Sequence, residues 1–394
     1  MFSSRTDWPL TPNRLSRLLE ERRRQGLPVL DLTESNPTHC GFNFDAEKLL
    51  SALADPRSLA YEPDPRGLLA ARRAVAGYYA ERGIQLVPEQ IFLTSSTSEA
   101  YSYVLRLLAN PGESILVPRP SYPLFDFLAG LNDVNLIWYS LAYHDGWRIE
   151  RHSLAAALAP GVERVRAIIV VHPNNPTGSF VDREELEVLL KYCQEHTLAL
   201  VADEVFADYA FAPEERRVTS HAGVSEALTF TLSGLSKISA LPQMKLAWVV
   251  VNGPPDVLPK ALARLEVIAD TYLSVSTPLA HALPTMLQTR HSLQPQVLER
   301  VRTNLRWLDE QLAADLPVSR LKAEGGWYAV LRLPAVRRDE EWALELLAAD
   351  GVLVHPGHFY DFATEGYLVI SLLPAAEILQ AGMRKLLARV LRSA

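Results

Sequence analysis

Short apolar runs alternate with amphipathic stretches between about residue 90 and residue 252 of this chain. Seven of the runs are rich in Val, Ile and Leu and are continuous instead of alternating, which is typical of strands buried on both faces. Because helical patterns separate them, we expect crossover connections and a largely parallel sheet. The predicted strands lie at 91–94, 115–117, 136–139, 167–171, 198–202, 228–232 and 246–251.

Two helices between these strands have boundaries that can be read from the sequence. One opens after Thr94 with a run of hydroxyl side chains and ends at Asn110-Pro111-Gly112. The other begins at Asp182, where Glu185 three residues later completes a capping box. Both are predicted to cover the sheet.

The pattern changes after about residue 275, where a long amphipathic stripe from Val297 to Leu312 precedes strand-like runs at 327–333, 352–355 and 367–373. We therefore predict an α/β fold with a mainly parallel seven-stranded sheet in a large three-layer domain, residues 41–274. Residues 1–40 and 275–394 are predicted to form a smaller α+β domain. A cleft between two such lobes is a favoured site for a small ligand.

Charge and cysteine content narrow the classes of partner and compartment. The chain has 39 basic and 46 acidic side chains, a net charge of −7, with both signs interleaved. This balance argues against nucleic acid and anionic membranes as partners. Two cysteines cannot build a disulfide framework or a Cys-based zinc site, and no stretch reaches the ~18 apolar residues of a membrane span. We predict a cytoplasmic protein.

Polar residues follow four of the predicted strands, at the sheet edge where open α/β folds bind their ligands. The segments supply an anion cradle, an amide, a carboxylate and an amine. They are Ser95-Ser96-Thr97-Ser98, His172 to Gly178, Asp203-Glu204 and Ser233 to Lys237.

These groups suit an aromatic phosphate that carries an aldehyde. A helix N-terminus holds a phosphate, a buried carboxylate keeps a pyridine nitrogen protonated, and an amine condenses with the aldehyde. Tyr122 is placed to stack on the ring. This set indicates pyridoxal 5'-phosphate.

Each segment also has an ordinary structural explanation. Asn175-Pro176-Thr177-Gly178 alone is a turn sequence, and Ser95 to Ser98 alone are helix caps. The occurrence of all the groups at strand ends favours the functional interpretation. His355 and His358 with Asp361 form a histidine pair in a Pro-Gly loop, which is more often structural, so no metal site is predicted.

The ordered motifs resemble the class I/II aminotransferases of pyridoxal phosphate fold type I over nearly the whole chain. They are Tyr61 with Gly67, Ser96-Thr97-Ser98, Pro120-Ser121-Tyr122-Pro123, Asn175-Pro176-Thr177-Gly178, Asp203-Glu204-Val205-Phe206 and Ser236-Lys237. The resemblance implies an enzyme that moves an amino group between an amino donor and an oxo acid or aldehyde by a ping-pong mechanism. It also implies a homodimer.

The resemblance assigns roles residue by residue. Lys237 matches the Schiff-base lysine that also shuttles a proton, and Asp203 matches the partner of the pyridine nitrogen. Asn175 matches an amide on the cofactor's phenolic oxygen that also faces the substrate. Phosphate ligands are matched by Thr97, Ser98, Ser236, Lys245 and, from the neighbouring subunit, Tyr61; Asn36 matches a segment that faces the substrate.

Three positions depart from the family pattern. Phe206 stands where a tyrosine is usual, so one hydrogen bond to the phenolic oxygen is missing, and Lys245 replaces an arginine. Val369 replaces the arginine that binds the substrate α-carboxylate. Arg119 and His358 are the candidates to replace it, or the substrate has no carboxylate at that place.

Other reactions stay open at this point. A lyase or decarboxylase would use Lys237, Asp203 and Asn175 in the same way. A cofactor-binding regulator without catalysis is a further alternative, given the departures at Phe206, Lys245 and Val369. The sequence does not name the amino donor or acceptor.

Overall fold

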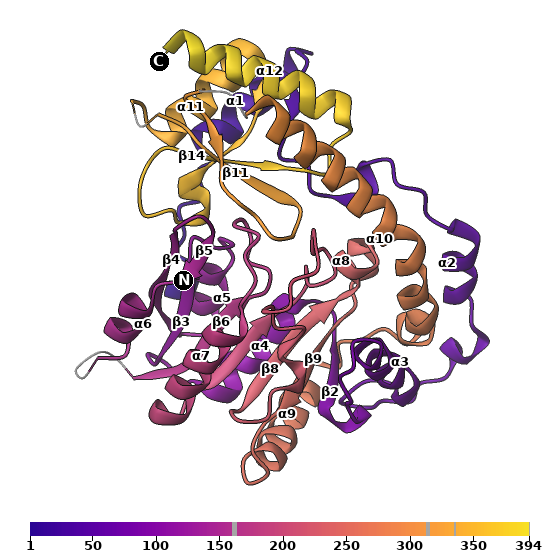
Figure 1. Cartoon of the computed structure of the whole chain (residues 1–394). Helices are drawn as coiled ribbons and strands as arrows, with labels where there is room; N and C mark the ends of the chain where they lie inside the picture. Colours follow the sequence, from indigo (N-terminus) through magenta and orange to yellow (C-terminus); the bar gives the residue numbers. More distant parts are fainter. Residues whose placement is uncertain (160–163, 313–315, 335, 394) are drawn as a thin grey trace.

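A large sheet forms the centre of the protein (Figure 1). The computed structural model describes residues 1–159, 164–312, 316–334 and 336–393. The sheet has eight strands in the order β2-β9-β8-β7-β6-β3-β4-β5. Their bounds are β2 Ile91–Thr94, β3 Ser114–Arg119, β4 Asn135–Tyr143, β5 Trp147–Ile149, β6 Val165–Val171, β7 Ala199–Asp203, β8 Thr229–Gly234 and β9 Ala247–Asn252.

The sheet is mainly parallel, as predicted. Strands β4, β3, β6, β7 and β8 run in one direction, whereas β9 is antiparallel to both β8 and β2. All seven predicted strands are present. The eighth, β5, is a three-residue antiparallel addition to β4 that is too short to give a continuous apolar run.

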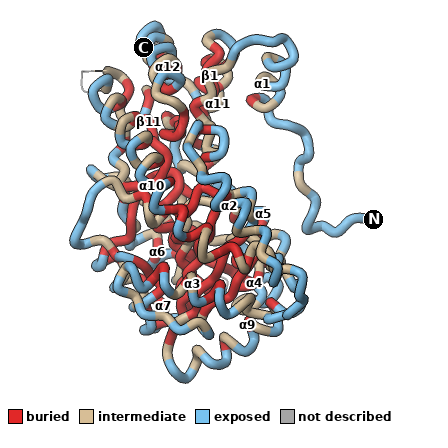
Figure 2. The backbone as a smooth tube through the Cα atoms, turned by 90° about the vertical axis from the view of Figure 1, so that its right-hand side faces the viewer, coloured by how far each residue is buried: buried red, intermediate tan, exposed pale blue. Residues whose placement is uncertain are grey.

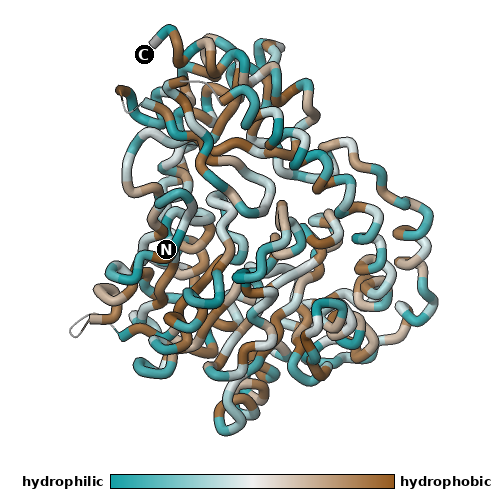
Figure 3. The backbone as a smooth tube through the Cα atoms, in the orientation of Figure 1, coloured by the Kyte–Doolittle hydropathy of each residue, from teal (hydrophilic) through white to brown (hydrophobic). Residues whose placement is uncertain are grey.

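Helices cover both faces of the sheet because alternate residues of each strand are buried on opposite sides. Helices α4, α5 and α9 pack on one face. Helices α3, α6 and α7 and the first turns of α10 pack on the other. Figures 2 and 3 show the buried, apolar strands between these layers. The helices are α3 Leu69–Ala80, α4 Thr97–Leu108, α5 Phe125–Leu131, α6 Arg151–Ala157, α7 Arg183–His196, α9 Leu258–Tyr272 and α10 Thr277–Gln311.

A smaller layered unit lies beyond the carboxyl edge of the large sheet (Figure 1). It contains a sheet in the order β10-β11-β14-β13 and the parallel pair β1-β12. Its elements are β1 Leu30–Asp31, β10 Ser319–Arg320, β11 Tyr328–Arg332, β12 Val352–Leu353, β13 His355–Pro356, β14 Tyr367–Ser371, α1 Arg14–Arg24, α11 Asp339–Glu345 and α12 Ala376–Ser393. Two further helices, α2 Ala46–Leu53 and α8 Leu235–Ile238, belong to the large-sheet region.

Helix α10 links the two units, since it packs against α2 and α3 at one end and α12 at the other. The domain boundaries at 40/41 and 274/275 stay a prediction. No helix within the described residues combines the length and apolar character needed to cross a membrane.

Backbone hydrogen bonds join the two units beside the carboxyl edge of the large sheet, and we call this contact between Gly178, Tyr209 and residues 324–326 the seam. The carbonyl oxygen of Gly178 accepts hydrogen bonds from the amides of Glu324 and Gly325, both at 3.0 Å, and Tyr209 O accepts one from Gly326 at 2.9 Å. Gly178 has a φ of 69°, and a Cβ there would overlap the carbonyl oxygen of Gly325. A Cβ on Gly325 would lie 2.6 Å from Tyr209 O. The Asn175 loop is thus fixed against the segment that enters β11.

Candidate active site

Strand register gathers the predicted phosphate ligands at one corner of the sheet. Thr94 of β2 pairs with Ala247 of β9, which in turn pairs with Gly234 of β8. The segments that follow Thr94 and Gly234, and the segment that precedes Ala247, therefore leave the same edge side by side. They carry Thr97 and Ser98 in the first turn of α4, Ser236 in α8, and Lys245. Lys245 is exposed and has a left-handed backbone, with φ 49°.

The amine, carboxylate and amide follow three adjacent strands. Asp203 ends β7 and pairs with Leu232 of β8 on one side and Val171 of β6 on the other. Lys237 follows β8 on α8, and Asn175 follows β6. The topology therefore brings the three predicted groups to the same edge of the sheet.

Asp203 is a carboxylate held from two sides. Tyr101 Oη of α4 donates to Oδ2 at 3.1 Å, and the amide of Val205 donates to Oδ1 at 3.1 Å. Burial raises the pKa of Asp203 to about 6, although both hydrogen bonds and the charge of Lys237 lower it. The side chain therefore binds a proton more tightly than an exposed aspartate and remains ionised at neutral pH.

Two aromatic rings lie beside the amine of Lys237. Its Nζ lies 5.0 Å from the ring centroid of Trp327 and 5.5 Å from that of Phe206, and these two rings meet edge to face at 5.2 Å. Burial lowers the pKa of Lys237 to about 8, while the charge of Asp203 opposes the shift. At neutral pH about a tenth of the amine is therefore in its neutral, nucleophilic form, far more than in an exposed lysine.

Asn175 has a polar atom that the protein leaves without a partner. The side chain is buried, and within the described residues no hydrogen-bond donor reaches its Oδ1 atom. A buried, unpaired amide oxygen is costly unless a ligand or water completes it. This atom marks the place where the site is completed by something other than protein.

Tyrosines from both units line the site above Asp203. Tyr122 is 46% exposed, and burial together with the charge of Asp203 raises its pKa. Burial raises the pKa of Tyr328 to about 12, and Ser35 and Asn175 are its hydrogen-bonding neighbours. Tyr360 is also buried, and its hydroxyl bonds His355 Nδ1 at 3.0 Å. The three hydroxyl groups act on one another and therefore lie close together, forming a hydroxyl-rich wall of the site.

The predicted substrate-binding residues have different surroundings. Asn36 caps a short helix, since its Oδ1 accepts from Thr38 N at 3.1 Å and from Thr38 Oγ1 at 2.8 Å. Arg119 ends β3, and its buried Nε has no partner among the described residues. The charge of Arg119 acts on Asp361, whose pKa is raised by burial and by Asp126 but lowered by Arg119 and His358.

Two other predicted positions are now placed. Val369 lies in β14, fully buried, between Val330 of β11 and His355 of β13. Tyr61 is 75% exposed and lines a surface pocket with Gly67, Leu273 and Thr277.

Several residues of the site gave no signal in the sequence. Tyr101 lies inside a helix, Trp327 and Tyr328 are consecutive positions of an apolar run, and Ser35 is a lone hydroxyl beside Asn36. Trp327 follows Gly325-Gly326, the pair that could have marked a close backbone approach.

Comparison with known proteins identifies the class of enzyme that this arrangement represents. The family model "Aminotransferase class I and II" matches residues 28–384. The glutamate-pyruvate aminotransferase AlaA of Escherichia coli strain K12 is 27% identical over 381 residues, covering 93% of this chain and 92% of that protein. The alanine aminotransferase of Mycobacterium tuberculosis strain H37Rv is 27% identical over 381 residues, covering 92% and 85%.

Solved structures share the fold. An alanine aminotransferase from Pyrococcus furiosus superimposes with a TM-score of 0.89 at 22% identity, with all of both chains covered. An Escherichia coli aminotransferase gives 0.85 at 24% identity, covering 99% of this chain and 98% of that one.

The chain belongs to the class I and II aminotransferases. It is a pyridoxal phosphate-dependent transferase, and the predicted fold, enzyme class and cofactor are confirmed. The geometry fits this cofactor, because the corner formed by α4, α8 and Lys245 suits a phosphate. The unpaired Asn175 Oδ1, the Asp203 carboxylate and the Lys237 amine all follow neighbouring strands.

Proposed function

We propose that the enzyme transfers amino groups from an α-amino acid to an oxo acid in two half-reactions, with Arg119 binding the substrate carboxylate. The observation that carries this proposal is the fully buried Val369, which brings no charge to β14. Arg119 is the first candidate because it lies three residues before Tyr122 and has an unpaired, buried Nε. The names of the relatives, which refer to glutamate, pyruvate and alanine, support an α-amino acid donor.

Each residue of the site has a defined task in this proposal. Bound pyridoxal phosphate supplies an aldehyde for the amino group and a ring that withdraws electrons from the substrate's Cα. Lys237 Nζ would hold the aldehyde and would move the proton at the substrate's Cα, for which a pKa near neutral is favourable. Asp203 would hold the proton of the ring nitrogen, Asn175 would orient the ring, and Tyr122 would stack on it. Trp327 and Phe206 exclude water from the amine.

The carboxylate assignment predicts a selective loss of activity. Arg119→Ala should lower kcat/KM for alanine and glutamate by roughly 30- to 5000-fold, because loss of one partner of a desolvated charge pair costs about 2 to 5 kcal/mol. Activity with ω-amino donors should change little. Arg216→Ala, at a side chain 70% exposed, is the control.

A different result is expected if the amino donor has no carboxylate near Arg119. Efficient use of ω-amino donors by the parent, together with unchanged α-amino acid kinetics in Arg119→Ala, would show that the donor carries no carboxylate at this place. Val369→Arg should then create activity with α-amino acids.

We also propose that the active unit is a homodimer in which Tyr61 reaches the phosphate site of the partner subunit. Tyr61 is 75% exposed, and two nearby apolar side chains are exposed as well: Leu59, two residues earlier, is 94% exposed, and Leu273, which lines the same pocket, is 65% exposed. Exposed apolar surface of this kind marks interaction sites. Cys40 and Cys193 are free and buried, which suits the reducing cytoplasm that we propose as the location.

Subunit complementation tests the dimer. Tyr61→Phe should weaken cofactor binding by roughly 10- to 150-fold through loss of a hydrogen bond to a charged group, and Lys237→Ala should remove the covalent link. A mixed dimer of the two variants should regain one intact site with the affinity of the parent. A fully active monomer at assay concentration would contradict the proposal.

A further inference from the structure

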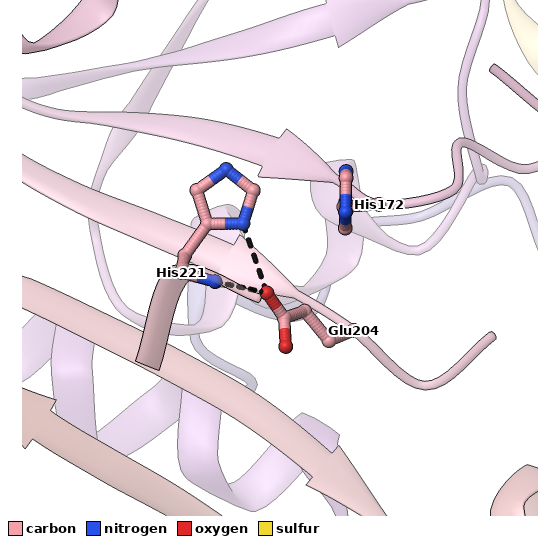
Figure 4. Close-up of side chains that lie close together, drawn as sticks. All are labelled: His172, Glu204 and His221. Carbon is pink, nitrogen blue, oxygen red and sulfur yellow. Dashed lines mark hydrogen bonds and ion pairs between the residues drawn. The ribbon is translucent and has the colours of Figure 1, made fainter. Parts of the chain in front are cut away.

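A second buried polar cluster lies directly behind Asp203 and has no part in the proposed chemistry. It consists of His172, Glu204 and His221, and all three side chains are buried. One polar atom from each lies within 4.8 Å of the others. Figure 4 shows the His221 ring on the Glu204 carboxylate and the His172 ring beside them.

The pleat of β7 puts Glu204 on the opposite side of the strand from Asp203. Successive residues of a strand point to opposite faces, so Asp203 follows Val201 toward α4, where Tyr101 binds it. Glu204 follows Ala202, and its amide continues the ladder by donating to Leu232 O at 2.8 Å. Two consecutive carboxylates therefore flank one strand end.

The Glu204 carboxylate receives three hydrogen bonds from a single loop. Ser220 Oγ donates to Oε2 at 2.6 Å, and Oε1 accepts from His221 N at 2.6 Å and His221 Nδ1 at 2.9 Å. Burial alone would raise the pKa of Glu204, but the hydrogen bonds from His221 and Ser220 lower it below its ordinary value. Glu204 is thus ionised at neutral pH.

The two histidines of the cluster have different roles. His172 Nδ1 accepts from Val181 N at 3.0 Å, and His172 Nε2 donates to Val218 O at 2.9 Å. Burial lowers the pKa of His172 to about 3, so this ring is neutral, and both of its nitrogens are occupied. The backbone thus uses the atoms that a metal ion would need, while His221 supplies the contact to Glu204.

We propose that the Glu204–His221 pair is a positioning device for the cofactor: the Glu204 carboxylate strengthens the hold of Asp203 on the ring-nitrogen proton, and His221 limits this effect. The inference rests on the proposed role of Asp203. A negative charge beside a carboxylate increases its proton affinity, and Glu204 acts on Asp203 in this direction. His172 N also donates to Asp203 O at 2.8 Å, which couples the cluster to the same strand end.

Other ionisable groups face the two carboxylates and stay unchanged in the test. Those near Glu204, besides the histidines, are Tyr78 and Tyr79 of α3; those near Asp203 are Tyr101, Tyr122 and Lys237.

The test is to load the full-length protein with pyridoxal phosphate labelled with nitrogen-15 in the ring and to follow its chemical shift as pH is raised. Glu204→Gln should lower the pH at which the ring nitrogen loses its proton by about one unit, a tenfold loss of proton affinity. His221→Gln, which removes the Nδ1 hydrogen bond to the Glu204 carboxylate, should raise that pH. Glu185→Gln is the matched control, since Glu185 is a buried carboxylate that accepts hydrogen bonds from Ile149 and Asp182 away from Asp203.

Three results would overturn the inference without touching the proposed role of Asp203. The first is that the ring nitrogen loses its proton at the same pH in Glu204→Gln as in the parent, while Asp203→Asn lowers that pH. The role of Asp203 would then stand without a contribution from Glu204. The second is an equal shift in Glu204→Gln and Glu185→Gln. The third is one equivalent of a tightly bound metal per chain in the purified protein that is lost in His221→Gln. A midpoint unaffected by Asp203→Asn would instead refute the proposed role of Asp203 and the inference with it. If Glu204→Gln does not fold, His221→Gln tests the inference alone. A rise in the pH at which the ring nitrogen loses its proton supports the inference, and a fall or no change overturns it.

Discussion

Lys237→Ala should abolish covalent attachment of the cofactor and lower kcat by about 10²- to 10⁴-fold through loss of proton transfer alone. The physical reason is the position of the amine at the edge shared with Asp203, in the aromatic surrounding of Trp327 and Phe206. Reduction of the loaded parent with borohydride, followed by peptide mapping, should place the pyridoxyl group on Lys237. Lys191→Ala, at a side chain 72% exposed, should give the parent pattern.

The lowered pKa of Lys237 gives this prediction a pH dependence. The neutral amine is the nucleophile, so the rate of cofactor attachment to cofactor-free protein should rise with pH through about 8 and then level off. Recovery of the pyridoxyl group on another lysine would exclude the assignment. A rate that keeps rising toward pH 10.5 would show that burial does not lower the pKa of Lys237.

Asp203→Asn should weaken cofactor binding and lower kcat, together by roughly 30- to 5000-fold, because the ring nitrogen loses a buried charged partner. Tyr101→Phe is the matched variant: it removes only the hydrogen bond of 3.1 Å to Asp203 and should have a smaller effect. Equilibrium titration of cofactor-free protein with pyridoxal phosphate measures the affinity, and half-reaction kinetics measure kcat.

Asp203 should also make the affinity for the cofactor fall at acid pH. Because burial raises the pKa of Asp203 to about 6, the cofactor-free protein has this group ionised above pH 6 and protonated below it. The affinity that depends on Asp203 should therefore be lost as pH falls through 6. Unchanged affinity in Asp203→Asn at neutral pH would show that the ring nitrogen has another partner.

The sequence predicted the elements that depend on local pattern. The seven continuous apolar runs are strands of the large sheet, and six of them are buried on both faces, whereas β4 is mostly half-buried. The capping box at Asp182 and Glu185 is present, with bonds of 2.9 and 3.0 Å. Strand-end positions placed Asp203, Asn175 and Lys237 at one edge, because parallel strands end together.

Contacts between distant segments could not be predicted in this way. Trp327 reaches Lys237 only because β11 faces the end of β8, and no pattern in either segment encodes that pairing. The cluster of His172, Glu204 and His221 joins three loops, whereas the histidines singled out in the sequence, His355 and His358, lie elsewhere. Asn36 was predicted to face the substrate, but its side chain accepts a hydrogen bond from the adjacent backbone amide of Thr38.

The seam between Gly178 and Gly325 limits how this enzyme can diversify. Neither position accepts a side chain without displacing one unit of the protein from the other, because each Cβ would meet a backbone carbonyl. Random mutagenesis should therefore recover almost no functional changes there. A change of substrate range must therefore come from side chains that line the site, such as Tyr122, Tyr328 and Tyr360. The backbone contact between Gly178 and Gly325, which holds the two units together, cannot change with them.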